Sequence, residues 1–335
     1  MSEIWDIKAR YKAAMNSEIG GQRGLFAGGG APTDNATIDY ITVSTTGDAT
    51  DFGDLTVGRR EHGGASSNTR AVFGGSHPGN SPDTLDYVTI QSLGNASDFG
   101  DLTHTNKGQR GASNATRAIF AGAHSNIDTM GYFSFITLGD AVDFGNLTDG
   151  RGLTMPIAST TRAIWAAGYD HPAEDNVIDY VTIATTGDAT DFGDLSNSRS
   201  DGGSGTASSS TRGIVMGGFN PSNDTSIDKL TIATTGNSTD FGDLATARGH
   251  SGSVTNTKRA VCGGGSPGAM NHIDYILIEN GGTAVDFGDL SLARYALGSA
   301  SERHGGIVST STSNRRKCSS TSRHMLDGWT LNYSY

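Results

Sequence analysis

A pentapeptide, Asp-Phe-Gly-Asp/Asn-Leu, recurs six times along this chain of 335 residues. Its copies begin 45 to 49 residues apart, at Asp51, Asp98, Asp143, Asp191, Asp240 and Asp286. A second marker has the same period and consists of an arginine followed by small and apolar residues that end in glycine. It begins at Arg23, Arg70, Arg117, Arg162, Arg212 and Arg259. A period of this length indicates that one supersecondary unit is copied and stacked along the chain.

Each repeat is predicted to be built from strands. Ile178-Asp-Tyr-Val-Thr-Ile183 alternates and is rich in β-branched residues, as half-buried strands are, and a Thr-Thr-Gly-Asp turn follows it. The arginine marker, the pentapeptide and a small-residue segment such as Gly203–Ser209 complete four strands in about 47 residues. Four short strands at this period are typical of a β-propeller blade, and a β-solenoid is the alternative.

We predict an all-β chain that forms a single propeller domain over residues 1–335. The repeats cover residues 23–69, 70–116, 117–161, 162–211, 212–258 and 259–302. Residues 303–335 resemble the first strands of a further repeat, and Trp5–Tyr11 resembles a missing last strand. This pattern predicts seven four-stranded blades, the last closed by N- and C-terminal strands, because closure removes free sheet edges. The alternative is six blades with an N-terminal helix over residues 3–17.

Composition agrees with this fold and limits the function. The chain has 48 glycines, about twice the average share, as strand crowding and turns require. Its net charge of −11 leaves no basic surplus for binding nucleic acid. The sequence has no run of 18 apolar residues, so no membrane-spanning helix is predicted. The N-terminus also lacks the apolar stretch of a secretory signal. Two cysteines, Cys262 and Cys318, are too few for a disulfide scaffold.

The glycine pair, the tyrosine-containing strand after it and the aromatic residue of the pentapeptide make each unit similar to a kelch repeat. The match departs from that family because phenylalanine stands where it usually has tryptophan. The near-verbatim unit Thr-Arg-Ala-Ile-Phe-Ala-Gly, Ile-Asp-Tyr-Val-Thr-Ile and Asp-Phe-Gly-Asp-Leu also resembles repeats in virion proteins of tailed phages that infect marine cyanobacteria. The resemblance covers residues 20–310 and implies a propeller in a virion, but propellers host many unrelated activities.

Residues that occur once in every blade are poor catalytic candidates, because an active site needs one asymmetric group of side chains. We expect the repeated residues to form a structural network of Asp–Arg or Asp–backbone hydrogen bonds. These positions are Asp51, Asp98, Asp143, Asp191, Asp240 and Asp286, with Arg70, Arg117, Arg162, Arg212 and Arg259. Ca²⁺ binding by acidic turns such as Asp48-Ala-Thr-Asp51 is the alternative, although two carboxylates are few for Ca²⁺. The nine histidines form no His-x-His pair, so we expect no metal and no cofactor. No unrepeated acid/base pair is apparent in the sequence, so we expect no enzymatic activity.

Two connections of each repeat, after the arginine marker and after the pentapeptide, differ from copy to copy, whereas the others hardly change. In four-stranded blades these two connections lie on one face, and recognition commonly resides in such loops. The alternative is that the loops vary because nothing constrains them. The candidate binding residues are His77, Asn80, Tyr169, His171, Phe219, Asn220 and Met270.

We therefore expect a non-enzymatic structural or binding module of a tailed-phage virion, at a tail, fibre or capsid-surface position. Its partners would be other virion proteins or a host surface polysaccharide, with several copies in one assembly. Assembly in the host cytoplasm and release by lysis would account for the missing signal peptide. The alternatives are a carbohydrate-active enzyme, which needs an unrepeated acid/base pair in the central funnel, a kelch-type oxidase, and an intracellular kelch scaffold.

Overall fold

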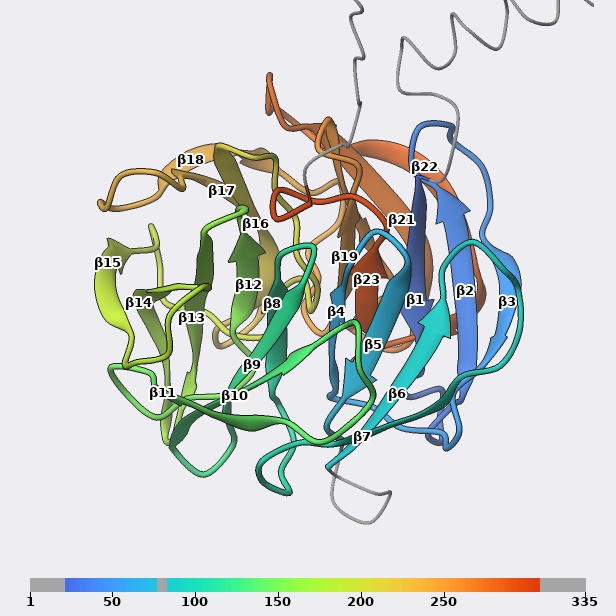
Figure 1. Ribbon diagram of the computed structural model, residues 1–335. Helices are drawn as coiled ribbons and strands as arrows, with labels where there is room; N and C mark the ends of the chain where they lie inside the picture. Colours follow the sequence, from blue (N-terminus) through green and yellow to red (C-terminus); the bar gives the residue numbers. More distant parts are fainter. Residues whose placement is uncertain (1–21, 77–82, 308–335) are drawn as a thin grey trace, which may run out of the picture.

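Six antiparallel β-sheets surround a common axis in the computed structural model of the chain, which describes residues 22–76 and 83–307 (Figure 1). The first blade contains β23 (Gly298–Ser301), β1 (Arg23–Ala27), β2 (Thr37–Thr42) and β3 (Thr50–Asp54), from the axis outward. The second contains β4 (Gly63–Ser66), β5 (Arg70–Gly74), β6 (Thr84–Thr89) and β7 (Ser97–Asp101). The third contains β8 (Arg110–Ser113), β9 (Arg117–Ala123), β10 (Ile127–Ser134) and β11 (Val142–Asn146).

The remaining three blades follow the same order. The fourth contains β12 (Met155–Ala158), β13 (Arg162–Asp170), β14 (Ala173–Thr182) and β15 (Thr190–Asp194). The fifth contains β16 (Arg212–Phe219), β17 (Asn223–Thr231) and β18 (Thr239–Asp243). The sixth contains β19 (Gly252–Thr255), β20 (Arg259–Gly263), β21 (Met270–Leu277) and β22 (Val285–Arg294). The described residues contain no helix, and hence none able to span a membrane.

The propeller is confirmed, but the prediction of seven blades is wrong. Each blade begins with its small-residue strand rather than with the arginine marker, so the ring needs only one further strand after β22. Strand β23 supplies it by pairing with β1, where Ala300 lies opposite Leu25. The predicted N-terminal strand and helix, and residues 308–335, lie outside the described residues.

The small-residue segment of the fifth blade, predicted as a strand over Gly203–Ser209, is less regular than its counterparts. It is held by isolated bridges, from Gly203 to Ser251 and from Ser208 to Gly213, so this sheet has three regular strands. Inner strands are joined around the axis by serine hydroxyls, for example from Ser113 Oγ to the Ser66 carbonyl oxygen at 2.8 Å. The glycines, alanines and serines of these inner segments allow them to approach closely.

The repeated pentapeptide joins neighbouring blades. Gly94 N donates to Phe52 O at 2.9 Å and Ala96 N donates to Asp54 O at 2.7 Å, and the same two bonds recur at all six interfaces at 2.6–2.9 Å. A Cβ added to Gly53, which has a φ of +145°, would lie 2.5 Å from the backbone of Gly94. The pentapeptide therefore needs glycine because the backbone of the next blade occupies the space of a side chain.

The repeated arginines and pentapeptide aspartates do not pair with each other in the described chain. Arg70 Nη1 donates to the Phe135 carbonyl oxygen of the next blade at 2.7 Å, and its guanidinium lies 5.0 Å from the Tyr87 ring centroid. Arg23, Arg117, Arg162, Arg212 and Arg259 bind the following blade in the same way. The aspartates at 51, 98, 143, 191, 240 and 286 are exposed, and Asp191 accepts the backbone N–H of Gly193.

A different set of arginines and aspartates forms buried ion pairs in five blades. Each arginine follows the pentapeptide of one blade and binds the aspartate of the third strand in the next. The pairs are Arg294–Asp39, Arg59–Asp86, Arg151–Asp179, Arg199–Asp228 and Arg248–Asp274. Asp86 also accepts the backbone N–H and the hydroxyl of Thr56, at 3.0 and 2.7 Å, so its charge is fully hydrogen-bonded.

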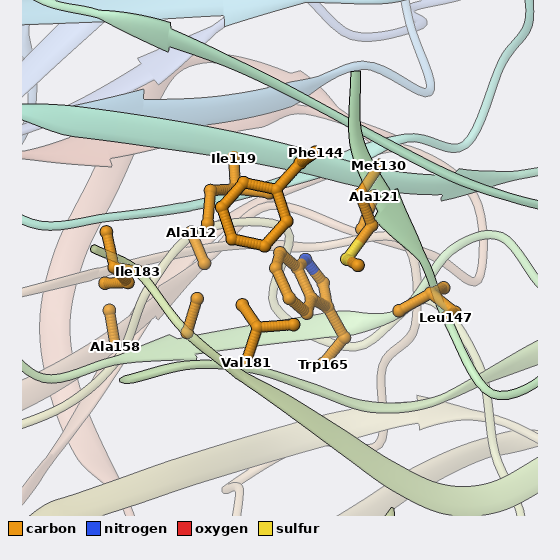
Figure 2. Close-up of a cluster of buried hydrophobic side chains, with 11 residues drawn as sticks. Ala112, Ile119, Ala121, Met130, Phe144, Leu147, Ala158, Trp165, Val181 and Ile183 are labelled. Carbon is orange, nitrogen blue, oxygen red and sulfur yellow. The ribbon is translucent and has the colours of Figure 1, made fainter. Parts of the chain in front are cut away.

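Apolar side chains fill six clusters, each between two neighbouring blades. Figure 2 shows the cluster between the third and fourth blades, where the Trp165 indole packs against Phe144, Val181 and Met130. Trp165 occupies the place of Phe26, Phe73 and Phe120 in other blades, and its Nε1 donates to the Arg110 carbonyl oxygen at 3.0 Å. This bond anchors the start of β8 beside the axis.

The two faces of the ring differ. Loops after the second strand and after the outer strand of each blade meet on one face, as Gly29 N binds Arg59 O and Gly30 N binds Tyr295 O. We call this the variable face, and it lies at the bottom of Figure 1. The opposite, repeated face carries the Thr-Thr-Gly-Asp turns. Gln22 and Ile307, the first and last described residues of the propeller, both lie at the repeated face.

Candidate binding site on the variable face

A closed ring of six backbone hydrogen bonds surrounds the axis at the variable face. One residue from each connection between blades takes part, and its N–H donates to the carbonyl oxygen of the preceding one at 2.6–2.9 Å. All six have a left-handed φ between 50° and 83°. They are Glu61, Gly108, Leu153, Asp201, His250 and Ala296. Five of these are not glycine, and such strained positions tend to gather at functional sites.

The side chains on this ring are not repeated. Asp201 is only 1 % exposed and binds two partners, because its Oδ1 accepts Arg110 Nη2 at 2.6 Å and its Oδ2 contacts His250 Nδ1. Burial alone would raise the pKa of Asp201, but the charges and hydrogen bonds of His250 and Arg110 lower it to about 2. The Asp201 carboxylate in turn raises the pKa of His250 above its usual value, against the effect of burial. The two cations therefore share one buried carboxylate.

Arg110 reaches the axis because the third blade departs from the repeat. Gly131 stands where the other blades have the aspartate of the buried ion pair, and Asn106 stands where they have its arginine. Arg110 instead occupies the first position of the inner strand, which is Gly63 in the second blade. The third blade has thus lost its own buried ion pair and contributes a cation to the axis, where it binds Asp201.

Glu61 forms the second charged group at the ring. Its carboxylate lies 3.0 Å from Lys107 Nζ and 3.9 Å from His124 Nε2. Burial and the Lys107 charge lower the pKa of His124, against the attraction of Glu61, so its imidazole is neutral near pH 7. The ring thus carries acidic, basic and imidazole groups at unrepeated positions.

A pocket of about 640 Å³ opens beside His250, between the sixth and first blades. Its wall is mostly apolar and contains Ala31, Pro32, Leu292, Ala293 and Ala269. Its polar edge is formed by His250, Tyr295 and Ser266. A largely apolar cavity with a few polar groups is the usual form of a small-ligand site.

Several predicted binding residues lie near the ring of six backbone hydrogen bonds. The Phe219 ring centroid lies 6.2 Å from that of His250, and Tyr169 lies 5.7 Å from His124 and 6.0 Å from His171. Met270 follows the pocket residue Ala269.

Asn220 has a local contact instead, because its Nδ2 donates to the Ser198 carbonyl oxygen at 2.8 Å. His77 and Asn80 lie outside the described residues. The structure thus places Phe219 beside His250, Tyr169 beside His124 and His171, and Asn220 in a loop contact.

Sequence reasoning missed the charged residues at the centre, namely Glu61, Arg110, Asp201 and His250. They come from the variable segment that follows each pentapeptide, whose sequence predicts only a loop. Aligning the repeats on their pentapeptides shows that one position bears Glu, Gly, Leu, Asp, His and Ala in turn. Variation at that position is the sequence feature that could have indicated a site. Only the closed ring, however, brings its six residues together.

No protein-family model matches the chain, and no curated protein matches its sequence. Among the residues the structure describes, no three His, Cys, Asp or Glu side chains are grouped so that they could hold a metal ion. Asp48, an acidic-turn residue considered for Ca²⁺, accepts the backbone N–H of Asp289 at 3.1 Å. The arrangement suits the recognition of a ligand by the pocket, the aromatic rings and the charged axis.

Proposed function

We propose that this protein is a non-enzymatic binding module of a tailed-phage virion, located at its tail, fibre or capsid surface. Its variable face would hold a neighbouring virion protein or a host surface glycan. The observation that carries the proposal is the unrepeated group of charged and aromatic side chains around the axis, on a scaffold whose pentapeptide hydrogen bonds recur at all six interfaces between blades. Rigid scaffolds with variable loops are commonly used for recognition.

The positions of the described chain ends support this orientation. Gln22 and Ile307 lie at the repeated face, and residues 302–307 cross the axis there, where Gly305 N donates to Ser208 Oγ at 3.2 Å. The first and last described residues therefore both lie at the face opposite the pocket. Attachment through that side would leave the variable face directed toward a partner.

The proposal of kelch-like repeats and a phage origin rests on the resemblance of the repeated unit noted in the sequence. The phage assignment can be tested by immunogold labelling of virions with an antibody raised against this propeller, followed by negative-stain microscopy. Gold at the tail, fibre or capsid surface is expected. Labelling only of the host cell interior would contradict the proposal and favour an intracellular scaffold.

One observation favours a second candidate, an enzyme. A buried aspartate that holds a histidine is the arrangement with which many enzymes orient a general base, and Asp201 holds His250 in this way. Incubation with polysaccharides and simple alcohols, with and without Cu²⁺ or Ca²⁺, distinguishes the candidates. The binding proposal expects no product, whereas product formation that His250→Gln abolishes would establish the enzyme.

The face assignment can be tested with matched variants. Tyr169→Ala combined with Phe219→Ala removes two partly buried rings from the variable face, whereas Thr186→Ala combined with Thr235→Ala trims the repeated face. On an array of bacterial surface polysaccharides, the first pair should weaken binding by roughly 1–4 kcal/mol, or about 5- to 1000-fold, because aromatic anchors dominate binding energy. The second pair should have no effect. A complex seated on the repeated turns, with the variable loops in solvent, would refute the assignment.

A further inference from the structure

His250 offers one hydrogen-bond donor to the pocket. Its Nδ1 is bound to Asp201, so Nε2 is the ring nitrogen left to bind a ligand, and the side chain is 33 % exposed and lines the pocket. A protonated imidazole donates from both nitrogens. The Phe219 ring lies 6.2 Å away and the Tyr295 ring 6.4 Å away, which places this donor between two aromatic side chains.

When His250 is protonated, the charges around it leave the site locally positive. Asp201, Glu61 and Arg110 are the charged groups that act on His250, and Lys107 binds Glu61 at 3.0 Å. Arg110, Lys107 and protonated His250 face two carboxylates, so one positive charge remains. The chain as a whole carries a net charge of −11, which makes this cationic site an exception on an acidic protein. A ligand with one negative charge would complete the balance.

The walls of the pocket suit a compact ligand with an apolar face. Ala31, Pro32, Leu292 and Ala293 provide aliphatic surface, and the Tyr295 ring provides a flat one. Sugar rings present C–H groups on one face and hydroxyl groups at their edge, and such rings commonly pack against aromatic side chains. The volume of about 640 Å³ lies in the range of small-molecule sites.

We propose that this pocket binds a carboxylated sugar, with the sugar ring against Tyr295 and the aliphatic wall and the carboxylate accepting a hydrogen bond from His250 Nε2. The inference rests on the proposed function as a glycan-binding module. It identifies the glycan class as acidic, either a uronate or a sialate, and locates the subsite between the sixth and first blades.

The test is calorimetric titration of the full chain with four probes, namely glucuronic acid, glucose, N-acetylneuraminic acid and N-acetylmannosamine. We expect at least one acidic sugar to bind ten-fold or more tightly than its neutral counterpart at pH 6. Which acid binds distinguishes a uronate from a sialate. Affinity should fall between pH 6 and pH 9, because His250 loses its proton and with it the hydrogen-bond donor at Nε2.

Two variants separate recognition from folding. His250→Gln should reduce acidic-sugar affinity at least ten-fold and abolish its pH dependence, whereas His272→Gln serves as the matched control, because His272 pairs with Asp289 outside the pocket and is 62 % exposed. Ala269→Glu, in an exposed loop, adds a negative charge to the pocket wall and should abolish binding without changing the melting temperature.

The outcomes are distinguishable. Equal binding of acidic and neutral sugars, or binding that Ala269→Glu leaves intact, overturns the acidic subsite and leaves the glycan-binding function standing. If none of the four sugars binds, but the Tyr169→Ala, Phe219→Ala variant still loses polysaccharide binding, the acidic subsite is likewise overturned and the glycan-binding function stands. If none of the four sugars binds and that variant binds polysaccharides with the same affinity as the unmodified protein, the proposed function fails together with the acidic subsite.

Discussion

Asp201→Asn is the sharpest single perturbation of the axial site. The substitution preserves shape, and asparagine tolerates the left-handed φ of +50° better than most residues do, so the main change is the loss of one negative charge. The Arg110 side chain is fully buried and would then lack its counter-charge. Removing one partner of a buried ion pair typically costs about 3–5 kcal/mol.

A second estimate comes from the pKa of Asp201. A folded pKa of about 2, against an ordinary carboxyl value of 3.8, corresponds to roughly 2 kcal/mol at 1.36 kcal/mol per pH unit. Because the folded pKa is the lower one, this stabilisation is present above pH 4 and is lost as the pH falls toward 2. Protonating Asp201 leaves its hydrogen-bonding atoms in place, whereas Asp201→Asn also changes one of them. The substitution should therefore cost more stability than protonation does.

The assay is thermal unfolding near pH 7, together with an NMR titration of His250. An unfolding entropy of about 2.1 cal/mol/K per residue predicts a fall in melting temperature of roughly 5–8 °C for Asp201→Asn. The pKa of His250 should also drop, because burial and Arg110 then act on it without the carboxylate.

Two further variants control for the mechanism. Asp86→Asn breaks the repeated pair with Arg59 and should cost similar stability while leaving the pKa of His250 unchanged. Adding Arg110→Met to Asp201→Asn should recover most of the loss, since no buried charge then remains unpaired. A single Asp201→Asn variant that melts within 1 °C of the unmodified protein would refute the reasoning.

Three other perturbations test the scaffold. Burial lowers the pKa of His304 to about 4, so the unfolded chain, with a pKa near 6.5, takes up a proton first and stability should fall by about 3 kcal/mol between pH 6.5 and pH 4. His304→Gln should flatten that dependence in chemical unfolding, and an unchanged slope would exclude His304 as its source. Gly53→Ala and Gly94→Ala both place a side chain at a φ near +145°, but only the first meets backbone, at 2.5 Å. Gly53→Ala should therefore cost at least about 1 kcal/mol more than Gly94→Ala, and equal losses would show that the interface yields. Deleting residues 298–307 removes β23 and leaves an unpaired edge on β1, so we expect aggregation by light scattering, whereas a monomeric product would contradict closure by this strand.

The repeated elements were predictable because each is specified within one unit. The period of about 47 residues, the alternating strands and the turn glycines are local patterns, and together they predicted a propeller of four-stranded blades. The number of blades was not predictable in the same way. The terminal residues resemble fragments of a repeat, and only the pairing of Ala300 with Leu25 shows where the ring closes.

The contacts of the scaffold were likewise predictable only in part. The sequence predicted that repeated aspartates and arginines have structural partners, but not which ones. Arg59 pairs with Asp86 in the next blade, whereas Arg70 binds a backbone carbonyl and a tyrosine ring. Both arginines occur at fixed positions in the repeat, so position alone does not identify their partners. The partners depend on the direction in which each side chain leaves its blade.

By itself the sequence determined the blade, the contrast between repeated and variable loops, and the placement of Tyr169 and Phe219 among the variable ones. Only the tertiary structure decided that Asp201 meets both Arg110 and His250, which lie 91 and 49 residues away along the chain. Sequence patterns report on neighbours within one repeat, whereas an axial site takes one residue from each of several repeats. Those residues meet only because the ring closes after six blades, and the closure depends on the packing angle between blades rather than on any local motif.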